Sequence, residues 1–102
     1  MQYVYVLYSK RDRKFYVGST ADLRRRMAEH TCGNVPSTKS RRPLVLVCYE
    51  AYVESSDALR RERYLKSSDG RKELRIRLRK VLERLSLMEN GEVAEWLKAA
   101  PC

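Results

Sequence analysis

The chain has 102 residues and a formal net charge of +9, with 22 Lys and Arg residues against 13 Asp and Glu residues. This length suits one domain with one modest core, and 43% hydrophobic with 34% charged residues is typical of a folded chain rather than a disordered one. The excess of positive charge favours a polyanionic partner, above all nucleic acid, over a merely solvated basic surface.

The same composition excludes several classes of protein. The longest uncharged apolar run, residues 44–49, is too short to span a membrane. Three widely spaced cysteines argue against a disulfide framework or a cysteine zinc site and favour a reducing cytoplasm. The positive charge lies within residues 1–85, whereas residues 86–102 are acidic. We therefore expect one folded domain over residues 1–85 and a poorly structured tail over residues 86–102.

Two strands are predicted at the start of the chain. Residues 3–8 are β-branched and aromatic on both faces, which is typical of a covered central strand. The charged residues 9–14 form a turn, and residues 15–17 return as a second, antiparallel strand. This hairpin places Tyr5 and Tyr16 on neighbouring strands; from the strands alone, packing is the commoner role for such a pair.

A helix follows the second strand. Gly18 ends the strand, Ser19 or Thr20 can cap a helix that begins near Ala21, and the helix ends near residues 32–33. Arg26 and His30 are four residues apart and therefore share one face of that helix. A helix N-terminus, a guanidinium and a phenol in a small volume suit a phosphate.

Residues 33–43 are predicted to form a loop that is rich in hydrogen-bond donors. A grip on a phosphate backbone and an ordinary solvated loop are equally compatible with this composition. The donors are Ser37, Thr38, Lys39, Ser40, Arg41 and Arg42. A third strand, again apolar on both faces, covers residues 44–52.

Two more helices are predicted after the third strand. Ser55 or Ser56 caps the first, residues 57–67, on which Glu62 is drawn towards the apolar side. A carboxylate there needs a partner, which is either an arginine or a divalent cation; spacing alone favours the arginine. The second begins at residues 67–70 and frays beyond Arg84, with a regular apolar stripe over Leu74, Leu78, Val81, Leu82 and Leu85.

The ordered set of these residues resembles the GIY-YIG nuclease domain, in particular its small stand-alone bacterial members. The first half of the motif is residues 3–5, Tyr-Val-Tyr, and the second is residues 16–18, Tyr-Val-Gly. Arg26 and His30 match the superfamily's arginine and its frequent histidine, and Glu62 matches its glutamate. The similarity covers roughly residues 2–80.

The resemblance implies an α/β (α+β) fold, a three-stranded antiparallel sheet flanked by three helices. It also implies phosphodiester hydrolysis with Glu62 binding Mg²⁺ or Mn²⁺ and Arg26 stabilising the developing charge. Tyr5 or Tyr16 would deprotonate or position the attacking water, assisted by His30, with nearby cations lowering the phenol's pKa. Gly18 has a structural role. The expected contacts to nucleic acid are Thr38, Lys39, Arg41, Arg42, Arg25 and Arg61.

The chain also departs from the superfamily's pattern. Tyr3 stands where the motif's name has Gly, and the Asn that often follows the glutamate helix has no convincing counterpart, since Asn90 lies at the edge of the tail. The expected function is a metal-dependent DNA endonuclease acting on single-stranded, flexible or branched DNA in repair or recombination. RNA is not excluded as a substrate. The alternatives are a non-cleaving nucleic-acid-binding module and an accessory subunit of a larger repair protein; a cytoplasmic, nucleoid-associated location is expected.

Overall fold

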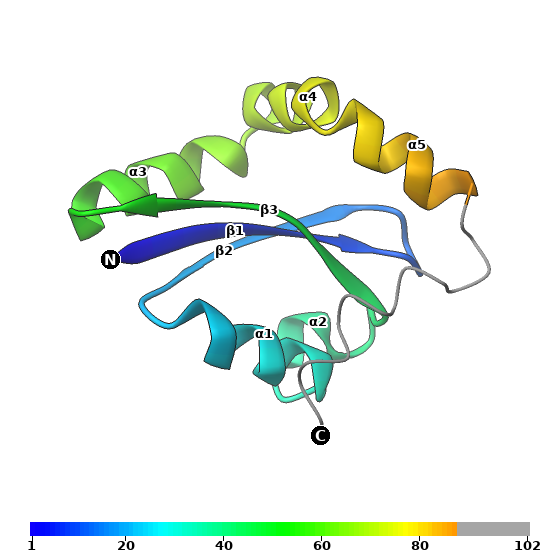
Figure 1. Cartoon of the computed structure of the whole chain (residues 1–102), viewed down its shortest axis with the longest axis horizontal. Helices are drawn as coiled ribbons and strands as arrows, with labels where there is room; N and C mark the ends of the chain where they lie inside the picture. The colour runs from blue at the N-terminus through cyan, green and yellow to red at the C-terminus, as the bar shows by residue number, and fades with distance from the viewer. Residues whose placement is uncertain (88–102) are drawn as a thin grey trace.

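The computed structural model describes residues 1–87, in which three strands and five helices form three layers. The strands are β1 (Gln2–Ser9), β2 (Phe15–Thr20) and β3 (Leu44–Tyr52). They form one antiparallel sheet in the order β2-β1-β3, so the apolar β1 is central as predicted. Figure 1 shows α1 (Leu23–Thr31) and α2 (Pro36–Lys39) on one side of the sheet. The other side is covered by α3 (Ser55–Leu65), α4 (Ser68–Arg77) and α5 (Arg79–Leu87).

The three-stranded antiparallel sheet confirms the predicted fold class, whereas the number and bounds of the helices need correction. Five helices, not three, flank the sheet within residues 1–87. The loop of residues 33–43 contains the short helix α2, which begins at Pro36; proline is favoured there because the first turn needs no N–H donor. The predicted tail of residues 88–102, including Asn90, lies outside the described residues.

Two helices begin at other residues than predicted. The N-cap of α1 is Asp22, not Ser19 or Thr20, because the Asp22 carboxylate accepts a hydrogen bond from the backbone N–H of Arg25. The helix α3 begins at Ser55 without a side-chain cap, so neither Ser55 nor Ser56 caps it as expected.

The predicted third helix is divided into α4 and α5 at Leu78, whose backbone leaves helical values. Each part keeps an apolar side chain on the sheet. Leu74 of α4 packs in the main core with Val6 and Phe15, and Leu85 of α5 packs against Val45 of β3. Because α5 continues to Leu87, the fraying expected beyond Arg84 is wrong.

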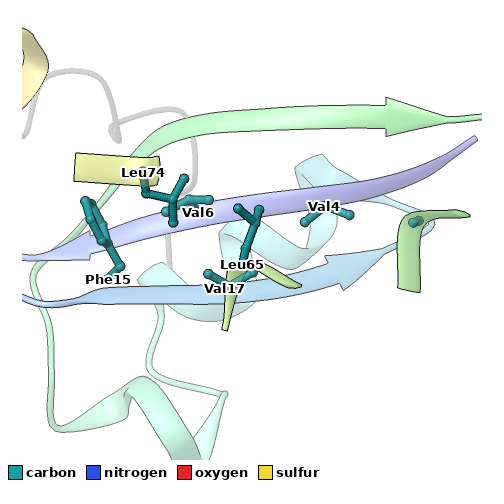
Figure 2. Close-up of a cluster of buried hydrophobic side chains, with 7 residues drawn as sticks. Val4, Val6, Phe15, Val17, Leu65 and Leu74 are labelled. Carbon is teal, nitrogen blue, oxygen red and sulfur yellow. The ribbon is translucent and has the colours of Figure 1, made fainter. Parts of the chain in front are cut away.

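The main core lies between the sheet and the helices α3 and α4. Figure 2 shows Val4 and Val6 of β1, Phe15 and Val17 of β2, Leu65 of α3 and Leu74 of α4 meeting there. A smaller cluster on the opposite face joins Tyr5, Leu7 and Leu44 to Leu23 and Met27 of α1. The alternation of side chains along β1 thus sends odd-numbered residues towards α1 and even-numbered residues towards α3.

An irregularity in the β1–β3 pairing decides which β3 side chains face α1. Val6 pairs with Cys48 but Leu7 pairs with Leu46, so one extra residue, Val47, is inserted in β3. The inserted residue changes the alternation along the strand, so that Leu46 and Tyr49 both lie on the α1 side. No helix within residues 1–87 is long and apolar enough to cross a membrane.

Candidate active site

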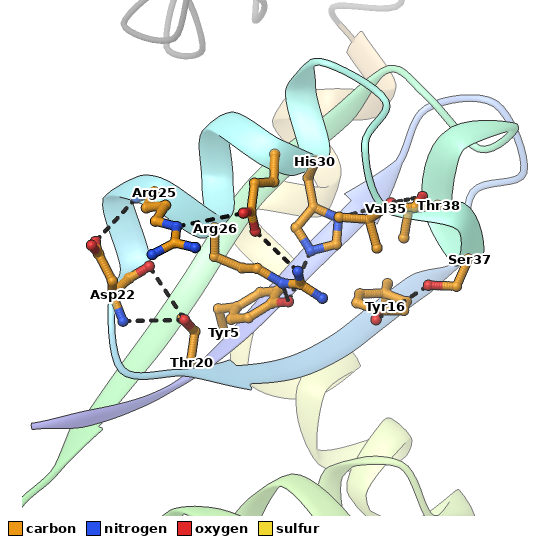
Figure 3. Close-up of polar contacts among 11 residues, drawn as sticks. Tyr5, Tyr16, Thr20, Asp22, Arg25, Arg26, His30, Val35, Ser37 and Thr38 are labelled. Carbon is orange, nitrogen blue, oxygen red and sulfur yellow. Dashed lines mark hydrogen bonds and ion pairs between the residues drawn. The ribbon is translucent and has the colours of Figure 1, made fainter.

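Tyr5 is the centre of a buried polar cluster between the sheet and α1 (Figure 3). Its side chain is 1% exposed, and its Oη lies 2.8 Å from His30 Nε2. The Nε of Arg26 donates a second hydrogen bond to the same oxygen at 3.4 Å. The central strand and one face of α1 therefore bring together three of the residues that the sequence singled out.

Gly18 makes room for the Tyr5 ring. The two residues are directly paired across β1 and β2, so their side chains would share one face of the sheet. A Cβ on Gly18 would contact the Tyr5 hydroxyl and lie 2.6 Å from Cζ, which is closer than real atoms approach. The Tyr-x-Gly pattern is thus explained by the space that the neighbouring tyrosine occupies.

Tyr16 completes a group of three rings on this face. Its centroid lies 5.3 Å from that of His30 and 6.4 Å from that of Tyr5. Its hydroxyl accepts a hydrogen bond from Ser37 of α2 at 3.4 Å, a contact exposed to solvent. Tyr16 is half-buried, so its phenol is open to a substrate while the Tyr5 phenol lies deeper.

His30 is enclosed and bonded at both ring nitrogens. It is 1% exposed, and its Nδ1 lies 2.8 Å from Thr38 Oγ1. Burial, with the Arg26 charge acting in the same direction, lowers the pKa of His30 to about 4, so the ring is neutral at neutral pH. With the ring proton on Nδ1, the imidazole donates to Thr38 Oγ1, the Thr38 hydroxyl donates to the Val35 carbonyl at 3.5 Å, and Nε2 accepts from Tyr5.

The Tyr5 phenol stays protonated in this environment. Burial raises its pKa, and the hydrogen bond from Arg26 opposes the rise without cancelling it. The charges of Tyr16 and Glu62 add to the increase. The expectation that nearby cations lower this phenol's pKa is therefore wrong for the site without substrate, because desolvation outweighs the single guanidinium.

Arg26 is oriented from two sides and remains partly exposed. Its hydrogen bond to Tyr5, together with one from Nη1 to Glu29 Oε1 at 3.0 Å, raises its pKa, so its charge is secure. Its side chain is 35% exposed and lines a cavity of about 350 Å³ with Thr20, Ala21, Asp22, Arg25 and Glu29. The guanidinium can therefore meet an anion that enters from solvent.

Glu62 lies on the α3 side of the sheet, in contact with Ser19 and outside the ring cluster. Its Oε1 accepts from Ser19 Oγ at 2.7 Å, and its Oε2 accepts from Lys66 Nζ at 2.9 Å. Ser19 follows Gly18 on the edge strand β2, so Glu62 approaches the active-site edge from the opposite face. The charged partner of Glu62 is thus a lysine, and the arginine favoured from spacing is wrong.

The donor set at Glu62 fits a hard divalent cation that keeps most of its water. Burial opposes ionisation of Glu62, but hydrogen bonds from Lys66 and Ser19 outweigh it and hold its pKa below the usual range. The side chain is 17% exposed, and Ser19 and Lys66 each donate to one of its carboxylate oxygens, so a cation would have to displace the Lys66 ammonium. Within residues 1–87 there is no group of three or more His, Cys, Asp or Glu residues placed to hold a metal ion. One carboxylate with waters and substrate phosphate is the arrangement that Mg²⁺ tolerates.

Several residues expected to contact nucleic acid are engaged within the protein. Thr38 is buried against His30, which corrects its assignment as a surface donor. Arg41 pairs with Asp12, and Arg61 bridges Glu50 and Glu73.

The remaining predicted contacts differ in how free they are. Arg42 donates to the backbone carbonyls of Thr31 and Lys39, and its guanidinium fills the space beside Gly33, so it holds α1 to α2. Lys39 is exposed, and the Arg25 side chain is 77% exposed. These two cations are the predicted contacts that remain open to a polyanion.

Sequence reasoning did not identify four side chains that orient the site. The contacts of Glu29 with Arg26 and of Lys66 with Glu62 follow helical spacings of three and four, a signal that was present in the sequence. Ser19 was considered only as a cap, and the role of Thr38 depends on α2, which the loop-like composition of residues 33–43 concealed.

Comparisons with known proteins agree with this geometry. A family model described as the GIY-YIG catalytic domain matches residues 1–75. A UPF0213 protein of Staphylococcus haemolyticus is 37% identical over 75 residues, which cover 72% of this chain and 90% of the relative. A UPF0213 protein of Natronomonas pharaonis is 40% identical over 75 residues, covering 72% and 87% respectively. No solved structure matches the chain.

Proposed function

The chain belongs to the GIY-YIG family of nuclease domains, and from that premise we propose that it is a metal-dependent endonuclease that hydrolyses phosphodiester bonds in DNA. The observation that carries the proposal is the position of the Tyr5 hydroxyl, which contacts both the neutral His30 and the charged Arg26. A proton acceptor and a stabiliser of negative charge thus meet at one oxygen. Hydrolysis of a phosphodiester needs both.

Arg26 is the group that receives the scissile phosphate. Arg26 lines the cavity beside α1 together with Glu29, and its hydrogen bonds to Tyr5 and Glu29 fix the plane of the guanidinium. A guanidinium that is already oriented stabilises charge developing on the phosphate without reorganisation. Arg25, one residue earlier on α1, adds positive potential that draws the polyanion towards the same cavity.

Proton removal from the attacking water runs through Tyr5 to His30. A water O–H proton passes to Tyr5 Oη while the Tyr5 proton passes to His30 Nε2, and the resulting hydroxide attacks phosphorus as the P–O bond to the leaving oxygen breaks. Burial raises the pKa of Tyr5 and keeps the phenol protonated, and the neutral His30 Nε2 at 2.8 Å is the atom placed to receive its proton. Thr38 holds the imidazole with Nε2 towards Tyr5. Tyr16 orients the phosphate or the water from the open side.

Glu62 would hold Mg²⁺ or Mn²⁺, and such a cation supplies Lewis-acid stabilisation of charge on the scissile phosphate and the leaving oxygen. Lys66 competes for the same carboxylate. It must swing away on its flexible stem, which its 52% exposed side chain permits. The Ser19 hydroxyl donates to the other oxygen of Glu62 and directs the carboxylate towards β2.

The proposed substrate is single-stranded, flexible or branched DNA in repair or recombination, within the cytoplasm and at the nucleoid. The support is the small open site and the positive net charge. A larger repair protein would supply any site selection. A second candidate function is a nucleic-acid-binding module without cleavage, and the Lys66–Glu62 ion pair favours it because that pair occupies the proposed metal ligand.

A cleavage assay of the purified full chain separates the two candidates. End-labelled single-stranded, duplex and branched DNA, with single-stranded RNA of matched sequence, are incubated with Mg²⁺, Mn²⁺ or EDTA. Glu62→Ala and Arg26→Ala are compared with Glu54→Ala, an exposed carboxylate at the start of the same helix as Glu62. We expect metal-dependent cleavage that both site variants lose and Glu54→Ala keeps. Retarded bands without cleavage in any metal would instead favour the binding module.

A further inference from the structure

Two tyrosines form an exposed aromatic pair on the sheet face that carries Tyr5. The rings of Tyr3 on β1 and Tyr49 on β3 meet edge to face, with centroids 6.1 Å apart and planes at 64°. Tyr3 is half-buried, whereas Tyr49 is 55% exposed although it lies within a strand. The structure therefore leaves a large aromatic side chain exposed to solvent on the α1 side of the sheet.

This pair adjoins the reaction centre through the strand register. Tyr49 is directly opposite Tyr5, and Tyr3 lies two residues before Tyr5 on the same face. Tyr3 is also opposite Thr20, which lines the cavity that Arg25 and Arg26 share. A chain of neighbours thus connects the Arg26 cavity to Tyr49: Thr20 lines the cavity, Tyr3 pairs with Thr20, and the Tyr3 ring contacts the Tyr49 ring.

The fold leaves this surface uncovered within residues 1–87. The start of β1 and the end of β3 extend beyond α1 (Figure 1), and the apolar contacts of α1 are with Tyr5, Leu7 and Leu44 instead. The residue inserted at Val47 sets the alternation that turns Tyr49 to this face. Without that insertion, the ring of Tyr49 would point to the α3 side.

The chemistry of the surface selects one occupant. Exposed rings next to cations are the pattern by which proteins bind single-stranded nucleic acid, since a base stacks on the ring and the phosphates meet the cations. The Arg25 side chain is 77% exposed and Arg26 35% exposed; both pair with Glu29, and both line the cavity that includes Thr20, the strand partner of Tyr3. Bases in a duplex are stacked on one another and cannot lie on a tyrosine, whereas unpaired bases can.

We infer that Tyr49, supported edge-on by Tyr3, stacks on an unpaired nucleobase of the strand whose phosphate enters the Arg26 cavity. This inference rests on the proposed function, because it specifies the substrate of the same site as a strand that is unpaired next to the scissile phosphate. The departure of Tyr3 from the glycine of the motif's name then acquires a role, since it supports the stacking ring.

Fluorescence anisotropy in EDTA tests the inference without cleavage. Labelled single-stranded DNA, RNA of the same sequence, the matched DNA duplex and a single strand of abasic sites are titrated with the full chain. The variants are Tyr49→Thr, which suits a strand, and Tyr49→Phe, which keeps the ring and serves as the matched control. Circular dichroism and melting confirm that each variant is folded, and Tyr3→Ala gives a second route if Tyr49→Thr is not.

We expect Tyr49→Thr to weaken binding of the single strand roughly tenfold. Tyr49→Phe should bind the single strand as wild type does, and neither variant should change binding of the duplex. The abasic strand should bind wild type and Tyr49→Thr equally weakly, because the contact that the variant removes is already missing from that ligand. Comparison of the DNA and RNA strands shows which sugar the site accepts.

Three results would overturn the inference: equal losses for single strand and duplex, no loss for Tyr49→Thr, or a loss of the same size for Tyr49→Phe. An increase in mass of the free protein that Tyr49→Thr abolishes would assign the surface to self-association instead. The inference and the proposed function fail separately. Cleavage without any effect of Tyr49 would leave a nuclease with another mode of binding, whereas ring-dependent binding without cleavage would leave the non-cleaving module.

Discussion

Tyr5 and Gly18 are paired across β1 and β2, and the tyrosine ring lies in the space that a side chain at position 18 would fill. Replacing Gly18 with Ala should therefore push the phenol away from His30 and Arg26. We expect a loss of cleavage rate of at least tenfold and a destabilisation of about 1–3 kcal/mol from overpacking. Cleavage assays measure the loss of rate, and urea unfolding measures the loss of stability.

The double variant Gly18→Ala/Tyr5→Leu provides the control for that prediction. If the two side chains compete for one space, the double variant is more stable than the sum of the single effects implies. Additive effects on the free energy of unfolding would show that Gly18 is required for another reason.

Thr38 positions His30 and does not contact the substrate. Removal of its hydroxyl in Thr38→Val leaves His30 Nδ1 without its partner, so the ring proton should redistribute between the two nitrogens. The chain contains one histidine, so ¹⁵N NMR of the imidazole reports its tautomer without ambiguity. Thr38→Ser should retain the wild-type tautomer and rate, whereas Thr38→Val should lower kcat with little change in KM. An unchanged imidazole spectrum in Thr38→Val would contradict the assignment.

The buried His30 makes the free energy of unfolding depend on pH between about 4 and 6.5, and the upper part of this window lies above the range where carboxylates titrate. Its pKa falls from 6.5 to about 4 on folding, so the unfolded chain binds more protons between these values. Stability from this residue is complete above pH 6.5 and is lost as the pH falls towards 4, by roughly 3 kcal/mol in total. Urea unfolding of wild type and His30→Asn between pH 5 and 7 should show this slope in wild type alone. Parallel curves would place the His30 pKa near its ordinary value.

Arg61 joins β3, α3 and α4 by its contacts with Glu50 and Glu73. The hydrogen bond to Glu50, and to a smaller extent the one to Glu73, raises the pKa of Arg61. Its guanidinium therefore stays charged at every pH at which the protein can be assayed. Arg61→Ala should cost about 1–3 kcal/mol of stability because the partly buried Glu50 loses its two hydrogen bonds from the guanidinium, whereas Glu73 keeps Arg77 and Tyr64. Arg61→Ala should leave nucleic-acid binding nearly unchanged, whereas removal of an arginine that contacts the nucleic acid would weaken it. Arg60→Ala, at an 80% exposed neighbouring side chain, is the control for stability.

Lys66 competes with the proposed metal for Glu62. Lys66→Met removes the ammonium while keeping the stem, so half-maximal cleavage should need several-fold less Mg²⁺ than in wild type. The measurement is the rate as a function of Mg²⁺ concentration, with calorimetric titration of Mn²⁺ as a second readout. Lys72→Met, at an exposed lysine on α4, should leave the metal requirement unchanged. A higher metal requirement in Lys66→Met would mean that the lysine assists the site.

Much of the site follows from local spacing in the sequence. The alternation along residues 3–8 and the hairpin placed Tyr5 beside the second strand, and the spacing of four placed Arg26 and His30 on one helix face. The structure brings these three together as those patterns imply. The lysine partner of Glu62 was equally accessible from spacing, but the expectation weighed only arginines and metal.

The chain by itself determined the central strand and the apolar faces of its helices, because these depend on periodicity. It also determined the family, through an ordered set of residues between positions 3 and 62. Only the tertiary structure decided that burial outweighs the Arg26 charge in its effect on the pKa of Tyr5. It decided as well that Thr38 contacts His30 and that Arg61 pairs with carboxylates within the protein. It also decided, through the residue inserted at Val47, that Tyr49 shares the face of Tyr5. Desolvation and strand register depend on which distant segments pack together, and no short window of sequence contains that information.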